Sequence, residues 1–344
     1  MVRTNNETEL GIKHVCERYI WLSFNLIILL SSLVGDTIIL IAILRYNAIK
    51  LHKVTVIIIQ YLAISDLLQT IFKVLPQTVT LVLNGWVLPT LVCHVEYHVT
   101  VFVGGMVTPM LTCCLTVSKL LIVSFPLKAR ILSSKLCHVI CVITCFLALL
   151  AHLPQVAASI VYAEAALYFE YAWYVCNYDY SSVTPGNWPH WYLVTTFSVG
   201  ATLVFGAITW SSLLLLRVAR RTALLQRLPI RRQGMMTVFL TVLLFYISYL
   251  PWLLVFQSDI ASPPLWRAAQ FVQNLNIMAN FVIYTLTVCS FRDFLRSMLY
   301  RVVLSLRLHS ATPQQRNALL LQQISRQRRS LRSSNRYQTE SSAV

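Results

Sequence analysis

Long apolar stretches recur along the chain and indicate its architecture. Seven stretches carry little charge, and each is long enough, at about 1.5 Å per helical residue, to cross about 30 Å of hydrocarbon. The buried helices of soluble proteins are rarely so long and so uniformly apolar. The pattern predicts seven membrane-spanning helices, at residues 19–44, 54–83, 93–117, 136–160, 191–216, 233–257 and 268–290.

The Lys and Arg residues beside these stretches predict the orientation, because basic residues near a span favour the cytosolic side. They gather after the first span, between the third and fourth, between the fifth and sixth, and after the seventh. Most acidic residues lie on the other side. We therefore expect a multi-pass protein of the plasma membrane, with an extracellular N-terminus (1–18), a membrane domain (19–300) and a largely disordered cytoplasmic tail (301–344).

Composition narrows the class of protein and its partners. Apolar residues make up 57% of the 344 residues and charged residues only 12%, which excludes an ordinary soluble domain. The net charge of +16 comes from basic residues beside span ends rather than from one patch with interleaved aromatic residues. We therefore expect anionic lipid of the inner leaflet as a partner of these basic residues, and no nucleic acid partner.

The side assigned to the outside carries several recognisable features. Asn6 begins an Asn-Glu-Thr triplet, the acceptor pattern for N-glycosylation. Cys93 and Cys176 both lie in this oxidising compartment and can form a disulfide, which leaves Cys16 without an obvious partner. The acidic and aromatic segment around Cys176 suits a short β-hairpin. It is either a lid that favours a basic or amidated peptide or a loop packed on the helix ends.

Ionisable residues inside the spans are few, and such residues usually face the interior of a bundle. Asp66 lies in the middle of the second span, and Asp36 lies in the first. They predict a buried polar cluster that is either a switch binding Na⁺ at Asp66 or a packing node that holds a proton. The expected members of this cluster are Asp36, Asp66, Thr108, Asn276 and Asn280. Lys73 and Glu96, near the outer ends of their spans, are expected to form an internal ion pair or to meet a ligand.

Four motifs, in the right order, resemble those of the rhodopsin-like (class A) G-protein-coupled receptors. LAISD at 62–66 is similar to the LAxxD of helix 2 in that family, and FYISYLP at 245–251 is similar to the FxxCWxP of helix 6. NFVIY at 280–284 is similar to the NPxxY of helix 7. FRDF at 291–294 is similar to the start of the short amphipathic helix 8.

The likeness covers nearly the whole chain from about 19 to 300, and Trp86 with Cys93 resembles the first outer loop of the family. In this resemblance Cys176 is the disulfide partner of Cys93. The chain is thus identified as a divergent, orphan-like member. The resemblance implies an all-α, integral membrane bundle of seven helices, and a receptor that transduces binding of an extracellular ligand to heterotrimeric G proteins.

The resemblance also implies roles for single residues. Phe245 and Pro251 belong to the helix 6 hinge, where proline removes a backbone donor and kinks the helix. The ligand pocket is expected to include Lys73, Glu96, Val101, Tyr249 and Asn274. The surface for G-protein coupling is expected to include Ser118, Lys119 and Tyr284.

Several residues depart from the family pattern at positions that matter for coupling to a G protein. SKL at 118–120 stands where the family has Asp-Arg-Tyr, and Arg231 stands where many members have an acid on helix 6. The usual resting-state lock therefore cannot form, and we expect appreciable signalling without ligand. Asp36 replaces the helix 1 Asn, Tyr249 the helix 6 Trp, and Phe281 the helix 7 Pro. Pro109 is expected to interrupt helix 3.

Two absences narrow the ligand class. Val101 stands where amine receptors of the family keep their Asp, so a protonated amine would lack a counter-ion. Asn274 stands where visual pigments carry the retinal lysine, which excludes a Schiff base there. A peptide is favoured, and lipid or small odorant-like ligands stay open.

Other classes of protein stay open as alternatives. A transporter or channel would line a pathway with the charged residues of the spans, although the two halves show no repeat. A scavenger receptor that does not signal would fit the altered helix 3 motif. An enzyme is not expected, because no catalytic set or metal-ligand spacing is found, and His152 and His190 are interpreted as isolated structural residues. Phosphorylated tail residues can recruit arrestin, and the ending 342–344 resembles a ligand of PDZ domains.

Overall fold

Helices make up almost all of the structure. The computed structural model describes residues 11–44, 52–124, 133–161, 167–170, 175–178, 188–221, 229–257 and 263–310. Their helices are α1 (Gly11–Leu44), α2 (Lys53–Gln69), α3 (Leu75–Leu83), α4 (Thr90–Val99), α5 (Thr108–Ser124), α7 (Ser134–Val161), α9 (Trp188–Arg221), α10 (Pro229–Gln257), α11 (Pro263–Thr287) and α12 (Cys289–Ser310). The wide π-helical turns η1 (Thr70–Val74) and η2 (Thr100–Val107) join α2 to α3 and α4 to α5.

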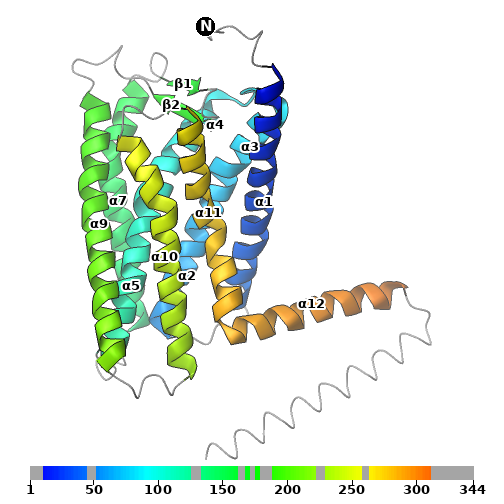
Figure 1. Ribbon diagram of the computed structural model, residues 1–344, viewed down its shortest axis with the longest axis vertical. Helices are drawn as coiled ribbons and strands as arrows, with labels where there is room; N and C mark the ends of the chain where they lie inside the picture. The colour runs from blue at the N-terminus through cyan, green and yellow to red at the C-terminus, as the bar shows by residue number, and fades with distance from the viewer. Residues whose placement is uncertain are drawn as a thin grey trace, which may run out of the picture. The chain divides into compact units, whose positions relative to one another are not determined.

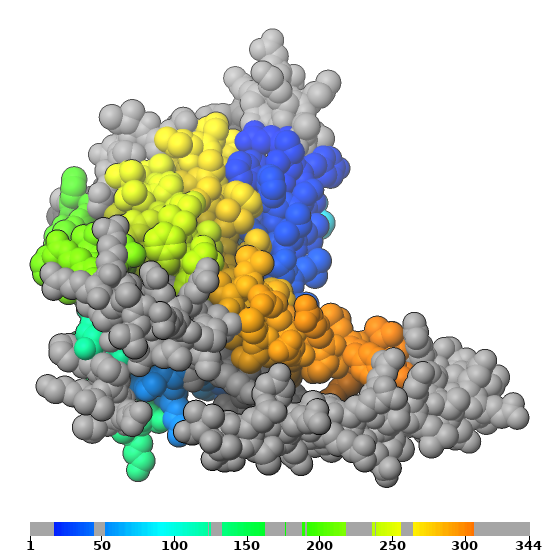
Figure 2. Space-filling view, turned by 60° about the horizontal axis from the view of Figure 1, so that its bottom comes forward, coloured from blue at the N-terminus to red at the C-terminus, as the bar shows by residue number. Residues whose placement is uncertain are grey.

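Seven helical spans pack side by side in the described part of residues 1–291, which form one compact unit (Figure 1). They are α1, α2 with α3, α4 with α5, α7, α9, α10 and α11. Helix α11 packs against both α1 and α10 (Figure 2), and α5 packs against α9. Large apolar side chains point outward, as Leu203 with 68% exposure does, whereas Asp36 and Asp66 are fully buried. This distribution of apolar and charged side chains is the reverse of that in a soluble protein, and it suits a bundle surrounded by hydrocarbon.

Length and composition identify most of these helices individually as membrane spans. Among the described residues, five qualify: Glu17–Leu44, Lys53–Leu83, Thr90–Ile122, Ser134–Val161 and Trp191–Arg217. A sixth qualifies when Pro264–Thr287 is taken together with Cys289–Ser305, and α10 contributes a shorter apolar stretch, Phe239–Val255. The predicted spans are found at the predicted places, and the helices extend beyond them at most ends.

The two wide turns each precede a proline. Pro76 is the second residue of α3, and Pro109 is the second residue of α5. A proline cannot donate a backbone hydrogen bond and its ring clashes with the carbonyl four residues earlier, so a wider turn before it relieves the conflict. The α-helix of the third span is thus interrupted by η2 just before Pro109, although the chain stays helical from α4 through η2 into α5.

A short hairpin crosses the end of the bundle at which α4 begins (Figure 1). Strand β1 (Leu167–Glu170) pairs antiparallel with β2 (Val175–Tyr178), and Phe169 lies opposite Cys176. This confirms the predicted hairpin around Cys176. Strand β2 contacts α4, so the loop covers one end of helix 3.

The predictions for the C-terminal part of the chain are partly wrong, and several other predictions fall outside the described residues. Helix α12 has 22 residues and continues to Ser310, so it is longer than the short helix expected, and it runs past the boundary placed at residue 300. Asn6, the phosphorylation sites and the C-terminal ending lie outside the described residues, as do the side chains of Cys16, His190 and Arg231.

Candidate functional site

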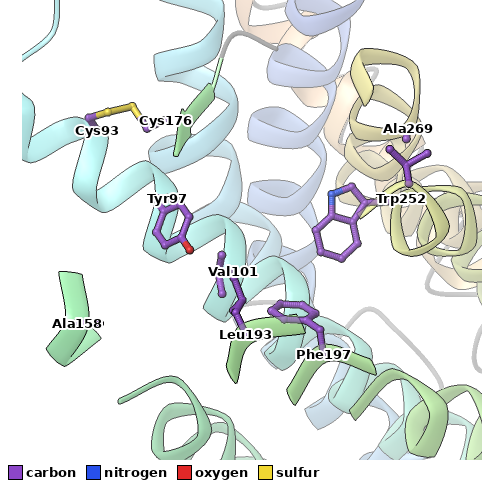
Figure 3. Close-up of a cluster of buried hydrophobic side chains, with 10 residues drawn as sticks. Cys93, Tyr97, Val101, Ala158, Cys176, Leu193, Phe197, Trp252 and Ala269 are labelled. Atoms are coloured by element: carbon purple, nitrogen blue, oxygen red, sulfur yellow. A yellow bond between two sulfur atoms is a disulfide. The ribbon is translucent and has the colours of Figure 1, made fainter. Parts of the chain in front are cut away.

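The hairpin is fastened to helix 3 by a covalent bond and a hydrogen bond. Cys93 on α4 and Cys176 on β2 form a disulfide with Cα atoms 5.4 Å apart, as the resemblance implied (Figure 3). One turn further along α4, Oε2 of Glu96 accepts a hydrogen bond from the backbone N–H of Cys176 at 3.1 Å. Glu96 is 1% exposed, so it is a buried positioning group for the hairpin.

Lys73 and Glu96 are not joined directly, which corrects the expected ion pair. Among the described residues, the direct salt bridges are Arg267–Glu17 and Arg296–Asp293. Lys73 and Glu96 are each bonded instead to a neutral amide of their own, because an amide oxygen accepts from a cation and an amide N–H donates to a carboxylate. Nζ of Lys73 donates to Gln273 at 3.0 Å, and Nε2 of Gln77 donates to Oε1 of Glu96 at 2.9 Å. The sequence analysis missed both glutamines, although both are polar residues within predicted apolar spans.

An apolar cavity of about 90 Å³ lies between the third, fourth, fifth and sixth spans. Tyr249 and Trp252 of α10 border it, and Phe197 of α9 faces Trp252 edge-on with ring centroids 5.7 Å apart (Figure 3). Gly105 also lines it, and a Cβ atom there would collide with the Phe197 ring. The absence of a side chain at Gly105 therefore allows the ring to pack on helix 3.

A smaller, polar cavity of about 30 Å³ lies between α1, α3 and α11. It is lined by Gln77, Asn274 and Arg267, and the Arg267 guanidinium pairs with Glu17 at 3.0 Å. Buried polar atoms at this cavity, Oδ1 of Asn25 and Oδ1 of Asn274 among them, have no hydrogen-bond partner in the described structure. The cavity can therefore receive a small group that donates hydrogen bonds.

The residues expected to form one ligand pocket are thus divided between separate places. Tyr249 borders the apolar cavity, and Asn274 borders the polar one. Lys73 and Glu96 are buried in hydrogen bonds between helices. Val101 packs in the apolar core with Cys93 and lines neither cavity (Figure 3).

Part of the predicted polar cluster is joined by hydrogen bonds, and this part contains Asp36, Asp66 and Asn280. Nδ2 of Asn280 donates to Oδ2 of Asp66 at 2.6 Å. Hydroxyl groups link the two aspartates: Ser32 donates to Oδ2 of Asp36 and contacts Thr70, which donates to the backbone carbonyl of Asp66. Asn276 is buried on the same helix as Asn280. Ser32 and Thr70 had not been predicted, because a lone hydroxyl in an apolar span gives no sign of its partner.

The cluster fits a small hard cation. Oδ1 of Asp66 and Oδ1 of Asp36 are buried without a hydrogen-bond partner in the described structure. Ser65 precedes Asp66 in sequence, and its hydroxyl group lies 2.7 Å from that of Thr108, so both are candidates for further oxygen ligands. An oxygen-only set with carboxylates is what Na⁺ and similar cations prefer.

Helix α10 is held on two sides by tyrosine hydroxyl groups. Tyr249 donates to the backbone carbonyl of Gly104 in η2 at 2.8 Å and stacks on Phe245 with centroids 4.6 Å apart. Tyr246 contacts Thr209 and donates to the carbonyl of Phe205 on α9 at 3.0 Å. These contacts lie just before Pro251, which is inside α10, so they surround the expected hinge.

The opposite end of the bundle contains the altered helix 3 motif. Lys119 is only 7% exposed, and Ser118 donates to the carbonyl of Leu115 on its own helix. Burial lowers the pKa of His52, at the start of α2, and the positive charge of Lys119 lowers it further. Tyr284 is fully buried, with its hydroxyl 3.5 Å from Oδ1 of Asn280. The expected coupling residues therefore lie on two helices, α5 and α11, with Tyr284 adjoining the polar cluster.

Comparison with protein families decides the class of the molecule. The sequence matches the family model described as 7 transmembrane receptor (rhodopsin family) over residues 35–299. The chain belongs to the rhodopsin family of receptors. The seven packed spans, the hairpin and its disulfide all agree with this membership. A comparison with curated proteins gave no match.

Membership makes this protein a multi-pass membrane receptor, and members of the family are receptors rather than enzymes. The motifs quoted from its second, sixth and seventh spans all lie within the matched residues. The receptor retains the family's disulfide and helix 7 Asn, and it carries a helix 3 without the usual acid and arginine.

Proposed function

We propose that this receptor lies in the plasma membrane with its hairpin outside, and that it transduces binding of an extracellular ligand to heterotrimeric G proteins. The observation that carries the proposal is the apolar cavity against Tyr249 and Trp252. Both residues belong to α10, which also contains Pro251. A ligand group in this cavity touches the helix that is expected to move.

The cavity sets the chemistry of that group. Its lining is almost entirely apolar, and Thr196 and Tyr249 supply the hydroxyl groups. An apolar cavity of about 150 Å³ holds a benzene molecule, so one of about 90 Å³ suits an aliphatic side chain. We propose a peptide that inserts such a side chain below the acidic and aromatic hairpin segment.

Signalling then follows from a shift between two packings of the bundle. The ligand can favour the active packing only by binding it more tightly than the resting one. Displacing Tyr249 breaks its bond to Gly104 and frees α10 to pivot at Pro251. At the other end, α10 and α11 are joined by the hydroxyl groups of Thr237 and Thr287, 2.8 Å apart. Separating them opens the surface beside Lys119 to a G protein.

Ligand-free nucleotide exchange tests the transduction. Membranes carrying the receptor are assayed for binding of a GTP analogue to each member of a G-protein panel, with receptor-free membranes as the baseline. We expect exchange above baseline with at least one G protein, and a loss of that exchange in Lys119→Ala. A well-expressed surface receptor that never exceeds the baseline, with or without peptides, would favour the scavenger alternative.

Two glycines on α9 test the ligand site. A Cβ at Gly200 or at Gly206 meets no atom within 4 Å, but only Gly200 lines the cavity. Peptides that raise exchange are first found by screening the unaltered receptor. Gly200→Leu should then weaken their potency about tenfold or more by filling the cavity, and Gly206→Leu should leave it unchanged. Equal effects of the two variants would remove the cavity from the proposal.

A further inference from the structure

A separate groove of about 610 Å³ lies between the third and fourth spans, near the hairpin end of the receptor. Its rim residues Leu91 and Ile160 are 71% and 73% exposed, so it opens away from the bundle. Both belong to apolar spans, so the medium outside the groove is lipid. The volume falls within the range of roughly 300–1,000 Å³ typical of small-molecule sites.

The groove has apolar walls and a polar floor made of histidines. Among the described residues, no Lys, Arg, Asp or Glu lines it. Nδ1 of His98 lies 3.0 Å from Nε2 of His152, and Nε2 of His98 lies 2.9 Å from Oγ of Ser159. The ring of His152 is 2% exposed and stacks on Phe102 with centroids 5.8 Å apart. His152 had been interpreted as isolated, and the structure corrects this.

The direction of these hydrogen bonds follows from one carbonyl. Ser159 has a single hydroxyl proton, and it donates that proton to the carbonyl of Val156 at 2.7 Å, since a carbonyl can only accept. Ser159 must therefore accept from Nε2–H of His98. A neutral His98 then has a bare Nδ1, which accepts from Nε2–H of His152. Neutral rings are expected, because an unpaired charge in hydrocarbon is costly.

The chain of hydrogen bonds from His152 through His98 to Ser159 is called the histidine relay below. Its His152 end is an unsatisfied acceptor. A neutral His152 that donates through Nε2 has no proton on Nδ1, and this nitrogen is buried without a hydrogen-bond partner in the described structure. A buried acceptor without a donor is unfavourable. The χ2 torsion of histidine is broad, so rocking of the ring presents Nδ1 to a donor held in the groove.

We propose that the groove binds a membrane lipid with a rigid apolar body and one neutral hydroxyl group, the chemistry of a sterol, and that this hydroxyl donates to Nδ1 of His152. Anionic lipids are disfavoured because the described lining of the groove offers no Lys or Arg to a phosphate or carboxylate. A phosphodiester or an ester also supplies only acceptors, whereas His152 requires a donor. This inference concerns a site on the lipid face and does not depend on the identity of the extracellular ligand.

The direction of the relay gives a test on the unaltered receptor. The purified protein is placed in nanodiscs of phosphatidylcholine with a photoreactive cholesterol analogue, and cross-linked peptides are identified by mass spectrometry. We expect cross-links to α4 and α7 at residues that line the groove. Unlabelled cholesterol should compete, and its 3-methyl ether, which can accept but not donate, should compete about threefold to tenfold less well. Equal competition by the alcohol and the ether would overturn the proposal.

Matched variants on one helix test the residue. His152→Phe keeps the ring that stacks on Phe102 but removes the acceptor, and His138→Phe makes the same change on α7 outside the groove. We expect His152→Phe to lower sterol labelling by about the same factor by which methylation of the alcohol weakens competition. In this variant, the alcohol and its methyl ether should compete equally well. Thermal unfolding of both variants checks that they fold. Labelling that persists in a folded His152→Phe variant, or that is confined to other helices, would overturn the proposal.

Discussion

Gly35 and Phe281 show how single residues in this receptor depend on one another. Phe281 stands where the family has the proline of its helix 7 motif, and its ring needs more room than a proline. A Cβ atom at Gly35 on α1 would lie 2.6 Å from Cγ of Phe281 and 2.7 Å from its Cβ. The glycine therefore allows α1 and α11 to approach with the larger ring between them.

Gly35→Ala should destabilise the receptor. The added methyl group forces the Phe281 ring or the two helices apart, and overpacking of this kind costs about 1–3 kcal/mol. We expect a lower midpoint of thermal unfolding in detergent and lower surface expression. Combining Gly35→Ala with Phe281→Gly should cost less than the sum of the two single losses, because the colliding Cβ and ring atoms are then absent. If the two losses simply add, the two positions do not interact as described.

Asp66 provides a second prediction at the scale of single residues. A cation bound only by the folded receptor raises its stability by mass action. Thermal unfolding should therefore shift upward with NaCl relative to N-methylglucamine chloride at equal ionic strength. Asp66→Asn should abolish the difference, and Asp293→Asn, an exposed site outside the cluster, should preserve it. The same shift in all three proteins would indicate a packing node that binds no sodium.

At the scale of elements, α10 is restrained by hydroxyl groups where the family uses an ion pair at the end of helix 3. The Tyr249 hydroxyl group bonds α10 to η2. The Thr237 hydroxyl group, nearer the start of α10, bonds it to α11. Neutral hydrogen bonds contribute about 0.5–1.5 kcal/mol each. A few such bonds can therefore set the balance between two packings of the bundle without a charged lock.

Tyr249→Phe should raise ligand-free nucleotide exchange. The variant keeps the ring stacked on Phe245 and removes the bond to Gly104 together with the interaction between the hydroxyl group and Thr108. If that bond exists in the resting packing alone, its loss shifts the equilibrium about twofold to tenfold toward the active one. Tyr192→Phe is the control, because it removes a similar hydroxyl-to-carbonyl bond between α9 and α7 and should leave exchange unchanged. Unchanged exchange in Tyr249→Phe would exclude this restraint.

At the scale of the whole molecule, orientation in the membrane is still a prediction from charge. The basic residues beside the spans place the N-terminus outside and the C-terminus in the cytosol. An epitope tag at the N-terminus should bind antibody on intact cells, and one at the C-terminus should bind only after permeabilisation. Tags that are both accessible on intact cells would contradict the topology on which the ligand and G-protein sites depend.

The number, order and approximate limits of the spans could be predicted from the sequence because hydrocarbon imposes a local rule on each span. Every backbone polar group must be satisfied within the span, and its side chains must be largely apolar. The disulfide and the Asp66–Asn280 contact were also within reach, because the family motifs mark those residues. Helix lengths were less well predicted, and α12 extends beyond the predicted limit because its polar composition hides it from a search for apolar runs.

The side chains that meet inside the bundle could not be predicted from the sequence, because their contacts depend on how the helices pack. Lys73 and its partner Gln273 are 200 residues apart, and nothing local relates them. A helix presents a different residue every 100° or so, so a small rotation or one wide turn such as η2 changes every contact between spans. The separate amide partners of Lys73 and Glu96, and the histidine relay beneath the groove, depend on those rotations.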